Sequence, residues 1–467
     1  MDRLIEYFRG YMPFYRRNLK LAVPVMLAQL GQATVQLLDT IMVGQLGKTE
    51  LAAVSFGGAS FFVGFAAALG LSFGSTPLIG VEYASGHHRK VSTIFQNSIL
   101  FNTIVTLVIG ALMLGLYHFM DNLGQPEEVC PMAKSYYLIL LSSLPFVLWF
   151  QAFRQFMDGV GNTKYAMIVT VSGNALNILL NWMLIFGELG CPRLGVDGAA
   201  YATLISRVCM CFAFILLVRA KQPYSRYFKF FGWHKFTLRE LKDLLRISSP
   251  IGLQMFMETF GMNVAVMFVG LCGTVALASH QIAITISCVT WMISCGIASA
   301  TTIRVSHQLG AKEFHSMRKA GVASMHLSLF FMGLCSILII VFRTSLAHIF
   351  TEDAEVIELA SILLIMTGIY QMGDGLQTVT IGALRGMKNV ITPMVVAFIC
   401  YIVVTISVSY FCGIYMGWGA PGIWFAYILE LYLASYLLIR RFKKDTKSLL
   451  EGTCPSSESS SSVESMV

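Results

Sequence analysis

Apolar stretches of about twenty residues or more recur along almost the whole chain, separated by short polar segments. A hydrocarbon layer about 30 Å thick is crossed by roughly 20 apolar residues in an α-helix. The pattern therefore predicts an all-α integral membrane protein with twelve transmembrane helices. The predicted spans are 20–44, 51–80, 92–119, 133–155, 166–187, 196–219, 247–271, 276–304, 321–350, 357–384, 391–416 and 420–440.

The composition agrees with a membrane protein and leaves little chain for a soluble domain. Of 467 residues, 56% are hydrophobic and only 12% are charged, about half the charged fraction of soluble domains. The sequence shows no Walker-type glycine-rich loop, no metal-ligand spacing and no nucleophile–base motif of a membrane enzyme,. We therefore expect neither an enzyme nor a cofactor.

The net charge of +8 is concentrated on one side of the predicted spans. The N-terminus and the segments that follow even-numbered spans hold nearly all Lys and Arg residues. The other side holds only Lys48, Lys134, Arg193 and Arg343, and Arg207 lies inside a span. By the positive-inside rule, both termini are expected in the cytoplasm. The basic excess thus indicates membrane topology rather than a nucleic-acid partner.

The two halves of the chain repeat one pattern. A shift of 226 residues pairs Pro24 with Pro250, and a shift of 227 pairs FMDGVGNTKYAM (156–167) with ALRGMKNVITPM (383–394). Each half holds six predicted spans, so both halves enter the membrane in the same orientation. This predicts two six-helix bundles related by a pseudo-two-fold axis along the membrane normal, a recurring plan among transporters.

The repeat also predicts the domain organisation. An amphipathic cytoplasmic segment is expected first and a partly disordered cytoplasmic tail, which includes the low-complexity PSSESSSSVESMV, last. The predicted divisions are the N-terminal segment 1–19, the N-terminal bundle 20–219, the basic linker 220–246, the C-terminal bundle 247–440 and the tail 441–467.

Three acidic residues inside predicted spans lack an obvious basic partner: Asp39, Glu258 and Asp374. A charge at the bilayer centre costs a few kcal/mol, so these positions indicate a functional site. Arg207 and Glu430, also inside spans, have no charged residue close to them in the sequence, and we interpret both as structural.

Amide side chains extend these acids into polar stripes, because residues three or four apart share one helical face. Unpaired amides are costly in lipid, so the stripes are expected to face bundle interiors or a wet cavity, as contacts between helices or as binding groups. The stripes are Gln29, Gln32, Gln36 and Asp39; Gln254 and Glu258; Tyr370 or Gln371 with Asp374, Gln377 and Thr378; and Asn174, Asn177 and Asn181.

Several longer motifs occur in matching order in the two halves. They are Pro24 … Asp39-Thr … Gly44-x-x-Gly47 … Glu50-Leu-Ala-Ala, NALNILLNWMLIFG (174–187), ASHQIA (278–283) and DGLQTVTIGALRGMKNVITP (374–393). Together they resemble the MATE (multidrug and toxic compound extrusion) transporters over essentially the whole membrane region. The combination of Glu258 and Asp374 is similar to the NorM branch of that family.

The resemblance implies a secondary active multidrug efflux antiporter in a bacterial inner membrane. Such a protein exports organic cations in exchange for Na+ or H+ by alternating access, and we expect a monomer. The implied cation-coupling site consists of Glu258, Asp374, Gln281 and Tyr370, with Na+ or a proton at the two carboxylates.

A second implied set of residues serves substrate or proton binding around Asp39. One prokaryotic branch has an aspartate at the position of Asn181, which cannot titrate here, so Asp39 is expected to act with its amides alone. The set is Asp39, Gln32, Gln36, Asn174, Asn177, Asn181 and Gln254.

The main alternative is a flippase for a lipid-linked precursor, which shares the architecture of the same superfamily. A strongly cationic central cavity is expected of such a protein. The charges inside the spans are mostly acidic here, which favours export of cations.

Overall fold

The computed structural model describes residues 2–122, 128–232 and 236–452. Within these residues, twelve helical segments are long and apolar enough to cross a membrane, which confirms the predicted number. The first half contains α1 (Asp2–Gly44), α2 (Lys48–Ser72), α3 (Ser75–Ala84), α4 (His88–Phe119), η1 (Met120–Asn122), α5 (Val129–Ser142), α6 (Leu144–Gly159), α7 (Thr163–Phe186), η2 (Glu188–Gly190), α8 (Val196–Ala220) and α9 (Ser225–Lys229). The second half contains α10 (Leu238–Leu271), α11 (Thr274–Gly310), α12 (Phe314–Val341), α13 (Arg343–His348), α14 (Ala354–Gly386), α15 (Ile391–Ala397), η4 (Phe398–Thr405), α16 (Ile406–Val408), η5 (Ser409–Tyr415) and α17 (Gly419–Leu450).

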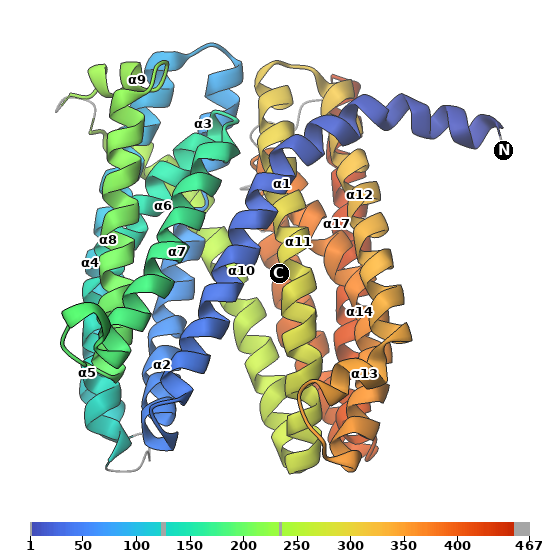
Figure 1. Cartoon of the computed structure of the whole chain (residues 1–467). Helices are drawn as coiled ribbons and strands as arrows, with labels where there is room; N and C mark the ends of the chain where they lie inside the picture. Colours follow the sequence, from blue (N-terminus) through green and yellow to red (C-terminus); the bar gives the residue numbers. More distant parts are fainter. Residues whose placement is uncertain (1, 123–127, 233–235, 453–467) are drawn as a thin grey trace.

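The helices form two bundles that stand side by side, one from each half of the chain (Figure 1). Helices α2 to α8 lie in the N-terminal bundle, and α10 to α17 lie in the C-terminal bundle. Helix α1 runs between them, because it packs against α7 of its own bundle and against α11 of the other. The arrangement confirms the predicted fold class.

Successive membrane-crossing segments alternate in direction, so the loops between them divide between two ends of the molecule. Helix α9 and the loops after α3 and α11 lie at the upper end in Figure 1, which we call the basic end. This end carries the segments that are rich in Lys and Arg.

The two bundles touch near the basic end. On α11, the His307 Nε2 atom lies 2.7 Å from the Gly159 carbonyl oxygen at the end of α6. The Ser85 hydroxyl donates to the Gly310 carbonyl oxygen at 3.0 Å. Both contacts join residues of different bundles, so any movement of one bundle against the other at this end must break them.

Four predicted spans contain a change of helical geometry. The predicted span 51–80 comprises α2 and α3, the span 133–155 comprises α5 and α6, and the span 321–350 comprises α12 and α13. The second break coincides with Pro145 in the first turn of α6, a position where proline is favoured because its missing N–H needs no helical partner. The span 391–416 contains two stretches of π-helix.

Several helices run past their predicted ends. The segment 1–19 continues without a break into the first membrane helix, and α10 begins inside the linker 220–246. Helix α17 reaches Leu450 and so includes the start of the predicted tail; the stretch PSSESSSSVESMV lies outside the described residues. Helix α14 likewise continues two residues beyond the predicted end at 384.

One glycine sets the approach of α10 to η4 and thereby positions Tyr401. A Cβ atom at Gly261 would lie 2.5 Å from the Tyr401 carbonyl oxygen, so we expect Gly261→Ala to lower the free energy of unfolding by about 1–3 kcal/mol through overpacking. Gly270→Ala on the same helix is the control, because its Cβ would meet nothing within 4 Å; it should be neutral or slightly stabilising. Thermal unfolding of the purified protein in detergent measures both changes. Equal shifts in Tm would contradict the packing assigned to Gly261.

Candidate functional site

A cavity of about 210 Å³ lies between the two bundles. The N-terminal half contributes residues of α1, α3 and α6 to its walls, and the C-terminal half contributes residues of α10, α11, α14 and η4. Apolar side chains, including Phe73, Met255 and Trp291, make up much of the lining. The site is therefore built by both halves of the repeat.

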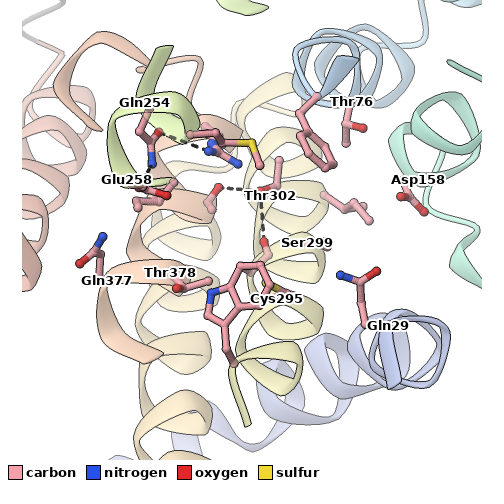
Figure 2. Close-up of a pocket in the computed structure, with 18 of the residues that line it drawn as sticks. Gln29, Thr76, Asp158, Gln254, Glu258, Cys295, Ser299, Thr302, Gln377 and Thr378 are labelled. Carbon is pink, nitrogen blue, oxygen red and sulfur yellow. Dashed lines mark hydrogen bonds between the residues drawn. The ribbon is translucent and has the colours of Figure 1, made fainter. Parts of the chain in front are cut away.

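Five charged side chains line this cavity within the described part of the chain. They are Arg154 and Asp158 from α6, Glu258 from α10, and Asp374 and Arg385 from α14. Asp158 stands on the opposite wall from Gln254 and Glu258 (Figure 2). The three carboxylates outnumber the two guanidinium groups, so the cavity favours cations when all five groups are charged.

An amide holds Glu258 and links it to a positive charge. The Gln254 Nε2 atom donates to Glu258 Oε1 at 2.7 Å, and Arg385 Nη2 donates to Gln254 Oε1 at 3.2 Å. Gln254 is one helical turn before Glu258, so α10 fixes their relative position. The polar stripe predicted on this helix thus orients its carboxylate towards the cavity.

Unpaired oxygen atoms lie one turn apart on α14. Asp374 Oδ2 and Gln377 Oε1 are buried without a hydrogen-bond partner among the described residues. The Gln377 amide nitrogen donates to the Tyr401 hydroxyl at 2.7 Å, so the Gln377 Oε1 atom is left free to bind a ligand. Carboxylate and amide oxygens are the ligands that hard cations prefer, so this part of the cavity fits a bound cation.

The structure does not bring Gln281 and Tyr370 into the lining of this cavity. Tyr370 is buried one turn before Asp374, and its ring packs against Trp424 at 5.7 Å between centroids. Gln281 is exposed on α11, ten residues before Trp291, or about 15 Å along the helix. Their predicted part in the coupling site stays a prediction.

Asp39 belongs to a separate polar chain inside the N-terminal bundle. Its Oδ1 atom accepts a hydrogen bond from the Asn181 amide. The same amide lies 3.2 Å from Asn177 Oδ1, and Asn177 in turn donates to the Thr203 hydroxyl at 3.4 Å. The structure therefore brings Asn177 and Asn181 of the α7 stripe to Asp39. Their part in substrate or proton binding, which the family resemblance implies, stays a prediction.

Arg207 supplies the positive charge that the local sequence around Asp39 lacks. It interacts electrostatically with Asp39, and its guanidinium donates to the Ser143 hydroxyl at 2.7 Å. The guanidinium also lies 5.5 Å from the Phe61 ring centroid and 5.2 Å from that of Phe65. Arg207 has no charged residue close to it in the sequence, as noted above; the acid with which it interacts comes from α1.

The other predicted amides divide between exposed and buried positions. Gln32 and Gln36 are exposed on α1, whereas Gln29 of the same stripe lines the cavity. The Asn174 amide nitrogen is buried without a partner in the described part of the chain. The α1 stripe therefore serves two places, with Gln29 at the cavity and Asp39 inside the bundle.

Glu430 lies behind the cavity wall. It is almost fully buried, and Thr405 donates to its Oε2 atom at 2.9 Å. Tyr401, which lines the cavity, interacts with the same carboxyl group. Glu430 is thus linked to the cavity through one side chain.

The comparisons with known proteins agree with this architecture. The profile of the MatE family matches residues 24–183 and again residues 250–411. The chain belongs to the MatE family. The two matches begin 226 residues apart, the shift that the sequence repeat predicts.

Curated relatives and solved structures match the MatE protein over nearly its full length. The multidrug resistance protein NorM of Photobacterium profundum is 28% identical over 433 residues, which cover 92% of this chain and 95% of that protein. Two solved structures share the fold. An outward-facing multidrug resistance MATE family transporter has a TM-score of 0.86 at 21% identity, covering 94% of this chain and 97% of its own. A transporter from Pyrococcus furiosus, described as having a binding pocket of reversed polarity that suggests a different function, has a TM-score of 0.85 at 22% identity, with coverage of 94% and 97%. Membership of the family and the twelve apolar helices make this chain a multi-pass membrane protein with a transport role.

Sequence reasoning missed three charged residues of the cavity: Arg154, Asp158 and Arg385. The predicted span 133–155 ends beside Arg154 and before Asp158, and the predicted span 357–384 ends just before Arg385. Charged side chains at the end of a span are normally solvated. The helices of the MatE protein continue further, to Gly159 and Gly386, and keep these side chains inside. The repeat offered a signal, because Asp158-Gly159 and Arg385-Gly386 occupy equivalent places in it.

The Asp39 chain gives a test of polar pairing in the N-terminal bundle. Asn181→Leu removes the amide that binds both Asp39 and Asn177, so we expect the free energy of unfolding to fall by about 1–3 kcal/mol. Asn174→Leu is the matched control on the same helix. The Asn174 amide nitrogen has no partner among the described residues, so little stability should be lost. Thermal unfolding in detergent compares the two variants, and a larger loss for Asn174→Leu would contradict this pairing.

Proposed function

We propose that this MatE protein is a multidrug efflux antiporter that exports lipophilic organic cations from a bacterial cytoplasm in exchange for Na+ or H+. The observation that carries the proposal is the cavity between the bundles, which combines an apolar lining with three carboxylates. Apolar walls with Met and aromatic side chains accept ligands of different shapes. The names of the NorM relatives support a role in multidrug resistance.

The coupling ion would bind at Glu258 and Asp374. Both carboxylates line one cavity, and Asp374 Oδ2 and Gln377 Oε1 are free to act as ligands. A proton could occupy the same carboxylates, since each ion neutralises a buried negative charge. Binding of either ion then changes the charge that a cationic substrate meets.

Transport would require that the cavity open alternately to the two sides of the membrane. The positive-inside rule places the basic end in the cytoplasm, and the bundles touch at that end through His307 with Gly159 and Ser85 with Gly310. With this orientation, the conformation described here would be closed towards the cytoplasm. An ion gradient drives export only if the ion and the substrate bind the two conformations with different affinities.

The charge of the cavity argues against the flippase alternative. A carrier of anionic lipid-linked precursors needs a cationic cavity, whereas here the carboxylates outnumber the guanidinium groups. The Pyrococcus furiosus structure, with its reversed polarity, illustrates that proteins of one fold differ in this property. Cavity charge is therefore the property on which the proposed substrate class rests.

Export by purified protein in liposomes tests the proposal. Ethidium, a fluorescent organic cation, is the probe, with sodium and proton gradients imposed separately. Glu258→Gln and Asp374→Asn should each reduce gradient-driven movement at least tenfold, because the ion loses a carboxylate ligand. Glu355→Gln, an exposed position on the same helix as Asp374, is the control and should leave transport intact. Normal coupling in both carboxylate variants would refute the proposed coupling site.

Substitution of two glutamines tests whether the coupling ion depends on the residues that line the cavity or on Gln281, which the family resemblance implies as a ligand. Gln254 contacts Glu258 at 2.7 Å, so Gln254→Ala should raise the ion concentration for half-maximal transport about tenfold. Gln281 is exposed outside the cavity lining, and Gln281→Ala should change this concentration less than twofold. An equal effect of the two substitutions would instead place Gln281 in the coupling site.

A further inference from the structure

Asp158 is a carboxylate of the central cavity that the proposed coupling site does not use. It lies near the end of α6, is only 6% exposed and contributes to the cavity lining from the N-terminal bundle. Glu258 stands on the opposite wall (Figure 2). The cavity thus has an acidic group on each side.

The Asp158 carboxylate is poorly satisfied within the protein. Its Oδ1 atom is buried without a hydrogen-bond partner in the described part of the chain. Its Oδ2 atom forms an ion pair with Arg154 on the same helix, at 4.0 Å from Arg154 Nε, which is too long for a hydrogen bond. Buried polar groups nearly always have partners, so an unpaired carboxylate oxygen at a cavity wall indicates a partner that enters from the cavity.

The sequence repeat places an opposite charge at the equivalent position of the other bundle. At a shift of 227 residues, Asp158-Gly159 coincides with Arg385-Gly386, and both charged side chains line the same cavity. Arg385 donates a hydrogen bond to Gln254, which in turn donates a hydrogen bond to Glu258. One copy of the motif therefore belongs to the proposed coupling network, whereas the other presents an acid whose one ion-pair partner is Arg154 of its own helix and whose Oδ1 atom has no hydrogen-bond partner among the described residues.

Asp39, the acid that the family resemblance associates with substrate or proton binding, does not compete for this role. It is bonded to Asn181 and interacts with Arg207. It also lies outside the lining of the cavity.

From these observations we infer that Asp158 is the residue that recognises the positive charge of the exported organic cation. The inference rests on the proposed function and deepens it by separating two cation sites. The substrate's charge is met by Asp158 on the N-terminal wall, and the coupling ion is held by Glu258 and Asp374 on the C-terminal wall. Trp291, Phe73 and Met255 line the same cavity and would supply apolar contacts to the substrate.

Ethidium binding to the purified full-length protein, followed by fluorescence anisotropy, tests this inference. Asp158→Asn keeps the shape of the side chain and removes its charge, so Kd should rise about tenfold or more. Asp158→Glu keeps the charge and should stay within about threefold of the wild type. Asp197→Asn, the same substitution at an acid of the same bundle outside the cavity lining, should leave Kd unchanged.

Arg385→Gln is a second variant that distinguishes loss of the Asp158 charge from a general loss of folding. This substitution makes the cavity more negative, so ethidium should bind at least as tightly as it does to the wild type. A higher Kd for ethidium in Asp158→Asn, together with an unchanged or lower Kd in Arg385→Gln, supports the assignment. Equal weakening in both variants, or wild-type affinity in Asp158→Asn, overturns it.

Transport in liposomes separates this inference from the proposed function. With Asp158→Asn, KM for ethidium should rise about tenfold, while Vmax and the identity of the driving ion stay as in the wild type. If the wild type exports ethidium under an ion gradient and Asp158→Asn has the same KM, only the role of Asp158 fails. If the wild type exports nothing under either gradient but Asp158→Asn still loses ethidium binding, the antiport proposal fails and the cation site stands.

Discussion

A charge inside a hydrocarbon layer must be enclosed by protein, and this constraint governs where the ionisable side chains inside the membrane-crossing segments lie. Asp39 is held by an amide and accompanied by a guanidinium within the N-terminal bundle. Glu258 and Asp374 face a cavity between the bundles, and Glu430 accepts a hydrogen bond behind its wall. The bundles can separate their charges from lipid only because each is built from six helices around an interior.

The fold was largely predictable, because it follows from span length and internal repetition. The length of each apolar stretch determines whether it crosses the membrane, and an even number of spans in each half determines the orientation of the repeat. Local geometry was less predictable. The breaks beside Gly74 and Pro145 and the π-helical turns of η4 and η5 depend on close packing; a Cβ atom at Gly74, for example, would lie 2.2 Å from the Ser248 hydroxyl oxygen on another helix.

The candidate site was predictable only where its residues share a helix. The stripes on α10 and α7 follow from helical periodicity, so Gln254 with Glu258 and Asn177 with Asn181 could be found from spacing. Contacts between helices are different, because periodicity gives the face of a residue but not the element that it meets. The pairing of Asp39 with Arg207 and the meeting of Asp158 with Glu258 at one cavity depend on how α8 and α6 are placed.

The repeat would allow one scaffold to provide the two cation sites proposed here. A duplicated frame places equivalent backbone positions at similar distances from the pseudo-two-fold axis, so Asp158 and Arg385 both reach the cavity. Their opposite charges make the two walls chemically different although the helices that carry them correspond. A symmetric pair of acids would bind two similar ions equally on both sides. Arg385 is hydrogen-bonded to the Gln254–Glu258 pair, so under the proposed mechanism the two walls would not compete for the same cation, and a rocking movement could load one ligand while it releases the other.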